Sequence, residues 1–258
     1  MLILIKIIAS AAAVLGLSIV SEKLSPRIAG VLAGLPLGLA LSLFFIGVEQ
    51  GDQFVEQAAT SALGGLGATL VFLIAYWIFS DIFSRFRIIL AGFFATIVYL
   101  IAASAIALLP QERWLLLIVT LVLARLMVIV MREVIDERVD PEDQVNLTLG
   151  VLINRSAAAA FAVVFITGLA STVGPAWSGI FSSFPITLLP LLIIVQISYS
   201  DQHAYSIIKH FPYGMGSLAI YALATSYLVL PLGIYVGSVL ALVLAIMYLC
   251  TYLFLSGR

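Results

Sequence analysis

The sequence predicts an all-α fold: a polytopic membrane helix bundle of about nine transmembrane helices, arranged as an inverted 4+1+4 repeat. Three observations support it: the composition, a series of apolar runs of membrane-spanning length, and an ungapped internal duplication. Of the 258 residues, 63% are hydrophobic and 10% are charged, against roughly 45–50% and about 25% in ordinary soluble domains. A soluble fold of this length cannot bury so many apolar side chains, whereas a bilayer surrounds them with hydrocarbon.

Charge and cysteine content exclude several function classes. A net charge of −1 with scattered basic residues argues against nucleic-acid binding. The single cysteine, Cys250, lies in the last apolar run, so we expect neither a disulfide framework nor a cysteine-based metal site. The HExxH, Gly-x-Ser-x-Gly and Walker motifs do not occur in the sequence. We therefore expect no enzyme and no cofactor; the expected partners are the lipid bilayer and a substrate, and the sequence is compatible with a homo-oligomer.

Nine apolar runs approach the length of about 20 residues that crosses a bilayer as a helix. Polar or helix-breaking clusters separate them. Backbone polar groups find no water in lipid, and the runs lack the strict alternation of barrel strands, so we expect each run to be helical. The runs lie at approximately 2–20, 28–48, 58–80, 88–109, 114–131, 146–169, 176–199, 205–229 and 232–255.

The two ends of the chain match each other at a shift of 149 positions without a gap. This register predicts three parts: a four-helix repeat A at 1–109, a linking fifth helix with a charged cytoplasmic loop at 110–149, and a four-helix repeat B at 150–258. Because residues 1–20 match an internal helix, we expect the first run to be a permanent span and not a cleaved signal. The matched pairs include Pro26 with Pro175, Gly30 with Gly179, Pro36 with Pro185, Asp52 with Asp201, Gln53 with Gln202, Gly65 with Gly214 and Gly67 with Gly216.

The fifth helix makes the two repeats face opposite ways. Four helices return the chain to its starting side, and the fifth carries it across before repeat B begins. The distribution of basic residues agrees, because cytoplasmic loops of membrane proteins are enriched in Lys and Arg. We expect a multi-pass protein of the cell inner membrane with the N-terminus outside and the C-terminus in the cytoplasm. The expected cytoplasmic face holds Lys23, Arg27, Arg85, Arg87, Arg132, Arg138, Lys209 and Arg258, and the outer face holds Arg113 and Lys6.

Two apolar runs contain a proline in mid-span, and these runs predict the substrate site. Inverted repeats are typical of transporters, whose site lies near the midplane where broken helices meet. Pro36 lies within the run 34–38, GLPLG, and Pro185 lies at the matched position. Proline removes a backbone donor and frees carbonyls, so we expect Gly34, Pro36 and Pro185 to contact substrate; a plain kink is the alternative. The other helix glycines are expected to be contact points between helices: Gly64, Gly65, Gly67, Gly214 and Gly216.

Basic residues inside the apolar runs are a second set of candidates for substrate binding. A charge inside the membrane is unfavourable unless it is paired or hydrated. Lys6 and Arg155 occupy equivalent positions in the two repeats, and such a pair of cations suits an anionic substrate or an acidic counter-residue. For Lys6, and for Arg125 in the fifth helix, the alternative is a side chain that reaches the headgroups.

The dipeptides Asp52-Gln53 and Asp201-Gln202 begin the helices that follow the broken ones. Aspartate favours the N-cap and the positive end of a helix, so capping is the simplest interpretation. The functional alternative is a gating or proton-coupling group on each side of the membrane. Two histidines seven residues apart do not predict a metal site. The candidates for gating or coupling are Glu49, Asp52, Gln53, Asp201, Gln202 and His203.

The first half contains the Ile28-Ala29-Gly30 run followed by Pro36, Glu49, Gly51, Gly65 and Gly67. With this pattern each half resembles the small four-helix GlpM-type membrane proteins. The second half keeps Gly179 and Pro185, but Ser198 replaces the glutamate. The resemblance implies a membrane location and a duplicated four-helix unit, and it implies no substrate.

Together these features predict a secondary transporter that moves a small anionic or lipid-linked anionic substrate by alternating access. The alternative is a non-transporting assembly or sensor protein of the membrane. Such a protein would contact its partner through the charged loop at 132–144.

Overall fold

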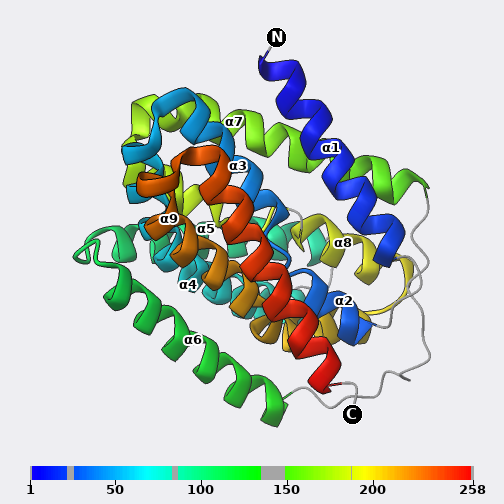
Figure 1. Ribbon diagram of the computed structural model, residues 1–258. Coiled ribbons are helices and arrows are strands. Elements are labelled where there is room, and N and C mark those ends of the chain that lie inside the picture. Colours follow the sequence, from blue (N-terminus) through cyan, green and yellow to red (C-terminus); the bar gives the residue numbers. More distant parts are fainter. Residues whose placement is uncertain (1, 22–25, 83–86, 135–148, 187, 257–258) are drawn as a thin grey trace.

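The structure, a computed structural model, describes residues 2–21, 26–82, 87–134, 149–186 and 188–256 (Figure 1). Every regular element in these ranges is an α-helix, which confirms the predicted all-α class. The helices are α1 (Leu2–Ser21), α2 (Pro26–Leu32), α3 (Leu37–Gln50), α4 (Asp52–Ile82), α5 (Arg87–Ala107), α6 (Arg113–Val134), α7 (Leu149–Ser182), α8 (Leu188–Ser198) and α9 (Asp201–Ser256).

Several of these helices are long and apolar enough to cross a bilayer, which indicates a multi-pass membrane protein. Large apolar side chains cover their outer surfaces; Phe93, Phe161 and Tyr235 are 60%, 70% and 66% exposed. Such surfaces suit contact with hydrocarbon and not with water. The six segments of sufficient length within the described residues are Ile28–Gln50, Asp52–Ile82, Ile88–Ala107, Arg113–Glu133, Ala159–Ser182 and Asp201–Ser256.

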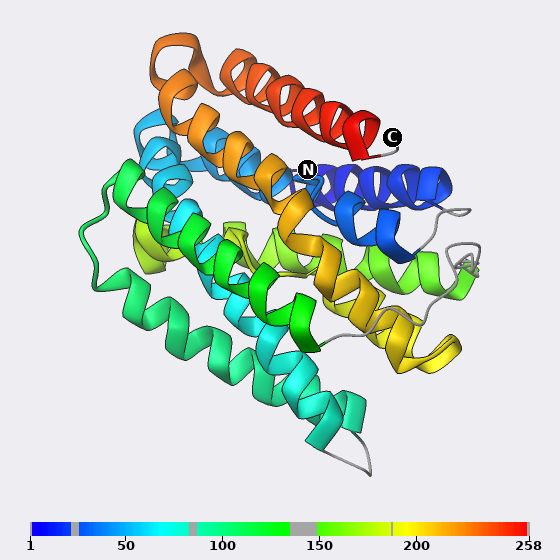
Figure 2. The same cartoon turned by 90° about the horizontal axis from the view of Figure 1, so that it is seen from below.

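Two glycines divide the longest helices. A straight helix of 56 residues such as α9 would extend about 84 Å, far more than the roughly 30 Å of hydrocarbon. Gly233 interrupts α9 with a φ of 75°, and Gly174 interrupts α7 with a φ of 78°; glycine adopts this left-handed region without steric cost. The chain turns back at Gly233, and the segment after it packs against residues 213–232: Gly237 lies against the backbone of Leu228, and Ser217 donates to the carbonyl oxygen of Ala245 (Figure 2).

Helix α4 forms the centre of the bundle. Its residues 58–70 are all buried, and most of them are Ala, Gly, Ser or Thr, the small residues that let membrane helices approach closely. Neighbouring helices pack around it, namely α5, α6, α7 and α9.

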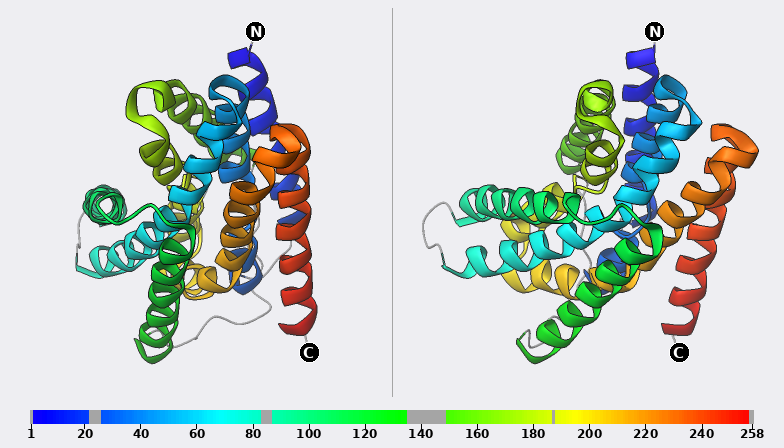
Figure 3. Two further views of the ribbon diagram at one scale, coloured as in Figure 1. Left: turned by 60° about the vertical axis from the view of Figure 1, so that its left-hand side comes forward. Right: turned by 90° about the vertical axis from the view of Figure 1, so that its left-hand side faces the viewer.

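The turns at Asp52 and Asp201 lie at opposite ends of α4. Asp52 begins α4, and its Oδ2 atom lies 3.9 Å from where a Cβ of Gly233 would be. At the other end, Gln196 donates hydrogen bonds to both Asp201 and Ser80. Ser80 and Asp52 are about 40 Å apart along the helix at 1.5 Å per residue. The start of α1 and the end of α9 also lie at opposite ends of the molecule (Figure 3).

Candidate functional site

The two proline-containing runs are interrupted, not merely kinked. Helix α2 ends at Leu32 and α3 begins at Leu37, and α7 ends at Ser182 before α8 begins at Leu188. Four backbone hydrogen bonds (N–H to O) shape the first break and recur in the second, each 149 positions later. The first set joins Gly34 to Val31, Leu35 to Leu32, Leu37 to Leu35 and Ala40 to Pro36; the second joins Ser183 to Ile180, Phe184 to Phe181, Ile186 to Phe184 and Leu189 to Pro185.

Each break packs against the opposite half of the chain through glycine. A Cβ at Gly179 would lie well under 3.0 Å from the carbonyl oxygen of Ala58, and a Cβ at Gly30 would lie 2.6 Å from that of Ile207. These two contacts join positions that correspond under the 149-residue shift, with the halves exchanged. Gly34 likewise contacts the backbone of Gly214.

The glycines therefore act as contact points between helices. This confirms the prediction for Gly65, which lies against Ile180, and for Gly214, which lies against Val31. Gly64 and Gly67 contact side chains of α5 and α6, and Gly216 contacts Tyr248. Gly34 packs on Gly214 in the same way, between Ala33 and Leu35 of the cavity wall described next; its contact with substrate stays a prediction.

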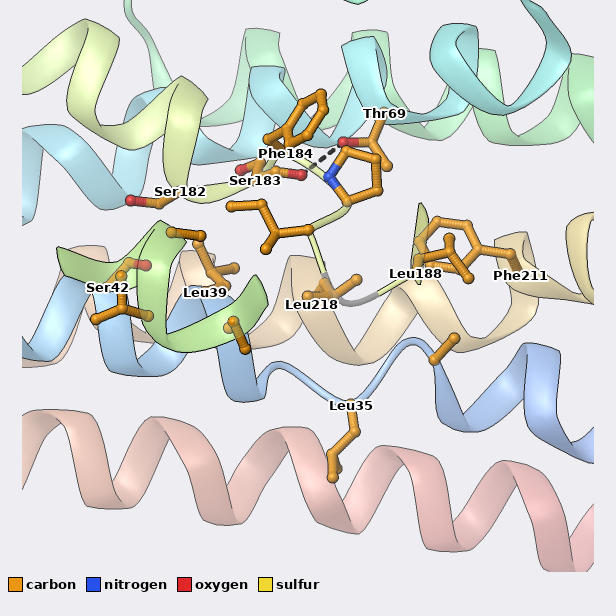
Figure 4. Close-up of a pocket in the computed structure, with 17 residues that line it drawn as sticks. Leu35, Leu39, Ser42, Thr69, Ser182, Ser183, Phe184, Leu188, Phe211 and Leu218 are labelled. Carbon is orange, nitrogen blue, oxygen red and sulfur yellow. Dashed lines mark hydrogen bonds between the residues drawn. The ribbon is translucent and has the colours of Figure 1, made fainter. Parts of the chain in front are cut away.

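A cavity with a volume of about 40 Å³ lies between the two breaks (Figure 4). One water molecule needs roughly 10–15 Å³ on this scale, so the cavity has room for about three waters or a small ion. The residues that line it come from both breaks and from α3, α4, α7, α8 and α9. They are Ala33, Leu35, Gly38, Leu39, Ser42, Thr69, Ala159, Ala162, Val163, Ser182, Ser183, Phe184, Pro185, Ile186, Leu188, Phe211 and Leu218.

Most hydroxyl groups at the cavity already donate a hydrogen bond to the protein. Thr69 donates to the carbonyl oxygen of Ser183 at 2.6 Å (Figure 4), Ser183 donates to that of Ala62 at 2.9 Å, and Ser182 donates to that of Ser178 at 2.7 Å. Ser42 differs: it is 1% exposed, and its hydroxyl has no hydrogen-bond partner among the residues that the structure describes.

Two helix N-termini also border the cavity. Gly38 and Leu39 belong to the first turn of α3, and Leu188 begins α8. The N–H groups of a first helical turn have no partner within their own helix, and α3 has no side-chain cap. No Asp or Glu belongs to the described wall of this cavity. Leu37 and Ala40 of the first turn of α3 bond Leu35 and Pro36, so the wall combines the N–H groups of Gly38 and Leu39, which have no partner within α3, with the positive ends of two helix dipoles.

Eight residues of the wall form four pairs that are 149 positions apart. Both halves of the chain therefore contribute equivalent positions, but the chemistry of the pairs differs. In two of the pairs, one residue has a hydroxyl group and its equivalent has none. The pairs are Ala33 with Ser182, Leu35 with Phe184, Leu39 with Leu188, and Thr69 with Leu218.

Lys6 is buried in an ion pair and does not reach the cavity. Its side chain donates to Glu49 Oε1 at 2.7 Å and to Thr167 Oγ1 at 2.6 Å, and the residue is only 2% exposed. The Lys6 ammonium group therefore pairs with an acidic residue and does not extend to the headgroup region. We call Lys6, Glu49 and Thr167 the outer ion pair. Since Thr167 lies one turn beyond Val163 of the cavity wall and Glu49 two turns beyond Ser42, the outer ion pair lies about 6–10 Å from the cavity along these helices.

The other two predicted cations differ in position. Arg125 is exposed on α6 and is not part of the cavity wall. Arg155 lies on α7, one helical turn before Ala159 of the wall; its side chain lies outside the described residues. The loop at 132–144 is likewise outside them from residue 135 onward.

A buried hydrogen-bond cluster holds the opposite end of the bundle. Tyr76 donates to Gln196 Oε1 at 2.8 Å, and Gln196 Nε2 donates to Ser80 at 2.6 Å and to Asp201 Oδ1 at 2.8 Å. We call Tyr76, Ser80, Gln196 and Asp201 the inner cluster. It fixes the C-terminal end of α8 against α4 and the start of α9.

Asp201 lies in the first turn of α9, the position that the sequence predicted for it. The preceding Ser200 also accepts a helix N–H, from His203 at 3.4 Å. The His203 ring nitrogen Nδ1 also contacts the Ser200 hydroxyl at 2.7 Å. Asp52 begins α4 in the same way, and Gln53 and Gln202 are exposed at the two turns.

The structure brings together polar residues that the sequence did not indicate as a site. Ser182 and Ser183 stand directly before the second break, a position that could have indicated them. Nothing in the sequence marks Ser42, Thr69 or Gln196, because isolated polar residues are common in apolar helices and their partners are remote in the chain.

The described residues contain no group of three or more His, Cys, Asp or Glu side chains placed to hold a metal ion. No protein-family model, curated protein or solved structure matches the chain. The resemblance of each half to GlpM-type proteins stays a prediction.

Proposed function

We propose that this protein is a secondary transporter of the cell inner membrane that binds a small anionic or lipid-linked anionic substrate in the cavity between the two breaks. The observation that carries the proposal is the wall of that cavity. Two interrupted helices bring their N-terminal turns to one buried space that also holds the free Ser42 hydroxyl and no described carboxylate. Helix N-termini bind anions through free N–H groups and the helix dipole.

The proposed architecture is a nine-span inverted repeat with the N-terminus outside. The matched hydrogen bonds of the two breaks and the exchanged glycine contacts support a duplicated unit. The placement of Asp52 and Asp201 at opposite ends of α4 supports inversion. Gly174 and Gly233 each divide a helix into two spans. If α2 with α3, and the end of α7 with α8, are counted as two broken spans, the chain makes nine crossings.

Alternating access requires that the ends of the bundle open in turn. The outer ion pair holds the end of α3 to α1 and α7, and the inner cluster holds the end of α8 to α4 and α9. Each contact therefore ties the second half of one broken helix at one end of the molecule. We propose that these two contacts release alternately, which gives Glu49 and Asp201 the gating role that the sequence suggested.

Arg155 completes the proposal as the nearest predicted cation. It precedes Ala159 of the cavity wall by one turn of α7, whereas Lys6 is neutralised by Glu49. In this scheme Arg155 attracts the anion, and the donors of the cavity bind it.

Flux through proteoliposomes tests the function. A panel of small anions and labelled anionic lipids is offered, and Ser42→Ala and Arg155→Ala are expected to reduce flux at least tenfold, the effect of losing about 1.4 kcal/mol of binding. Ser104→Ala, which alters an exposed serine of α5, and Arg125→Ala, which alters the exposed arginine of α6, are the matched controls. Flux that survives Ser42→Ala and Arg155→Ala in folded protein would refute the site.

A further inference from the structure

An apolar groove opens beside the cavity, among α5, α7 and α8. Its volume is about 490 Å³, within the range of roughly 300–1,000 Å³ that ligand pockets occupy. Four phenylalanine side chains form much of its wall: Phe161, Phe165, Phe181 and Phe184.

The polar side chains in the described wall of the groove already donate their hydrogen bonds to the protein. Thr96 and Tyr99 are the polar residues of its described wall. Thr96 donates to the carbonyl oxygen of Gly92 at 2.7 Å, and Tyr99 donates to that of Ile180 at 2.7 Å. Hydrocarbon is therefore the chemistry that fits this space, because a polar group placed in it would lose its hydrogen bonds to water.

The groove and the cavity are adjacent compartments. Ala162, Phe184 and Ile186 belong to both walls, so a single layer of side chains separates the apolar space from the donors of the cavity. On the other side the groove reaches the surface, where Phe161 is 70% exposed and Phe165 is 54% exposed within an apolar segment of membrane-spanning length. The groove thus leads from the hydrocarbon region to the cavity.

A route from water is less direct. A polar pocket of about 280 Å³ lies near the start of α4, and Glu56, Thr60 and Gln111 are part of its wall. Between this pocket and the cavity, Gly179 packs against Ala58 without room for even a methyl group. Ile46 and Ile166 are buried between the outer ion pair and the cavity, and their side chains form an apolar barrier on that side as well.

We propose that the substrate is amphipathic, with its anionic head in the cavity and its hydrocarbon chain in the groove. The proposal rests on the proposed function and specifies its substrate as a lipid-linked anion. The cavity, at about 40 Å³, admits only the small head of such a molecule, whereas the groove, at about 490 Å³, accommodates the chain. A water-soluble anion would use the cavity and leave the groove to ordinary bilayer lipid.

Photolabelling tests this assignment. The full chain is placed in phosphatidylcholine vesicles that contain a minor fraction of phosphatidate with a diazirine in its acyl chain, and labelled peptides are mapped by mass spectrometry. A second set carries the same diazirine on phosphatidylcholine. We expect phosphatidate to label the peptide with Phe161 and Phe165 about tenfold more efficiently. Phe165→Ala should reduce this labelling, while Phe93→Ala, at an exposed phenylalanine of α5 outside the groove, should not.

The outcomes separate the two proposals. Equal labelling by the two lipids means that bilayer lipid alone fills the groove and overturns the inference. If labelling is equal but the same vesicles take up inorganic phosphate in a manner that requires Ser42, the transporter stands and its substrate is water-soluble. Preferential phosphatidate labelling that Ser42→Ala abolishes supports the inference. The same preference without any movement of labelled phosphatidate across the bilayer leaves a lipid site and defeats the transport function.

Discussion

Replacing Gly179 with alanine tests the contact between α7 and α4. The added Cβ would lie well under 3.0 Å from the backbone oxygen of Ala58, and a buried backbone cannot move aside as a flexible side chain can. Overpacking of this kind costs about 1–3 kcal/mol. Alanine also gains about 0.5–1 kcal/mol over glycine inside a helix, so the expected net loss of stability is on the order of 1–2 kcal/mol.

Gly168→Ala is the matched control, because Gly168 lies in the part of α7 before Gly174 with nothing within 4 Å of an added Cβ. This variant should gain the helix stability of alanine without the clash, and it should unfold at a denaturant concentration equal to or higher than that of the parent. Reversible unfolding in mixed detergent and dodecyl sulfate micelles, followed by circular dichroism, measures both variants. The reasoning fails if Gly179→Ala and Gly168→Ala are equally stable. Gly30→Ala, at the corresponding position against Ile207, should be destabilising as well.

Three further changes test other contacts. Lys6→Met leaves Glu49 unpaired and should lower the free energy of unfolding by about 1–2 kcal/mol, less than the 3–5 kcal/mol of a fully buried pair, because the Glu49 side chain is 27% exposed. In the same unfolding assay, the double variant with Glu49→Gln should lose less stability than the sum of the two single variants; losses that simply add would contradict the pairing. Tyr99→Phe removes the bond to a buried carbonyl and should lower stability by about 1–3 kcal/mol, which an unchanged melting temperature would contradict. In a cysteine-free background, Asp52→Cys and Asp201→Cys should react with an impermeant maleimide from opposite sides of the membrane; reaction from one shared side removes the inverted repeat.

Hydropathy located the helices better than it located their ends. The run expected at 58–80 is part of a helix that begins at Asp52, and the run expected at 205–229 begins at Asp201. The first turns that hydropathy did not include contain Gln, Glu and His. These residues lower the mean hydropathy, but they are compatible with a helix where the chain leaves the membrane. The breaks at the prolines and the glycine contacts were foreseeable because proline and glycine limit backbone geometry directly.

The polar contacts of the site were not foreseeable on the same basis. Lys6 and Glu49 were each singled out, but nothing in the sequence joins them to each other or to Thr167. Their pairing depends on how α1, α3 and α7 meet in space, and helix periodicity reports only neighbours within one helix. Ser42 was overlooked for a related reason: its significance comes from the partner that it lacks, which only the packed structure reveals.

The two breaks have the same pattern of backbone hydrogen bonds, but side chains tie the second break more firmly to its neighbours. Hydroxyl groups of Thr69 and Tyr99 bond the carbonyls of Ser183 and Ile180, tying the second break to α4 and α5. The residue equivalent to Thr69 is Leu218, which has no hydroxyl group, and the residue equivalent to Tyr99 is Tyr248, which donates to Tyr213 of α9 and not to the first break. A freed carbonyl in lipid is unfavourable, so the tied break resists rearrangement while the first can exchange partners at lower cost. We therefore expect the backbone around the first break to open more readily than the backbone around the second. Faster amide exchange at 33–37 than at 183–186 would support this asymmetry, and equal exchange would count against it.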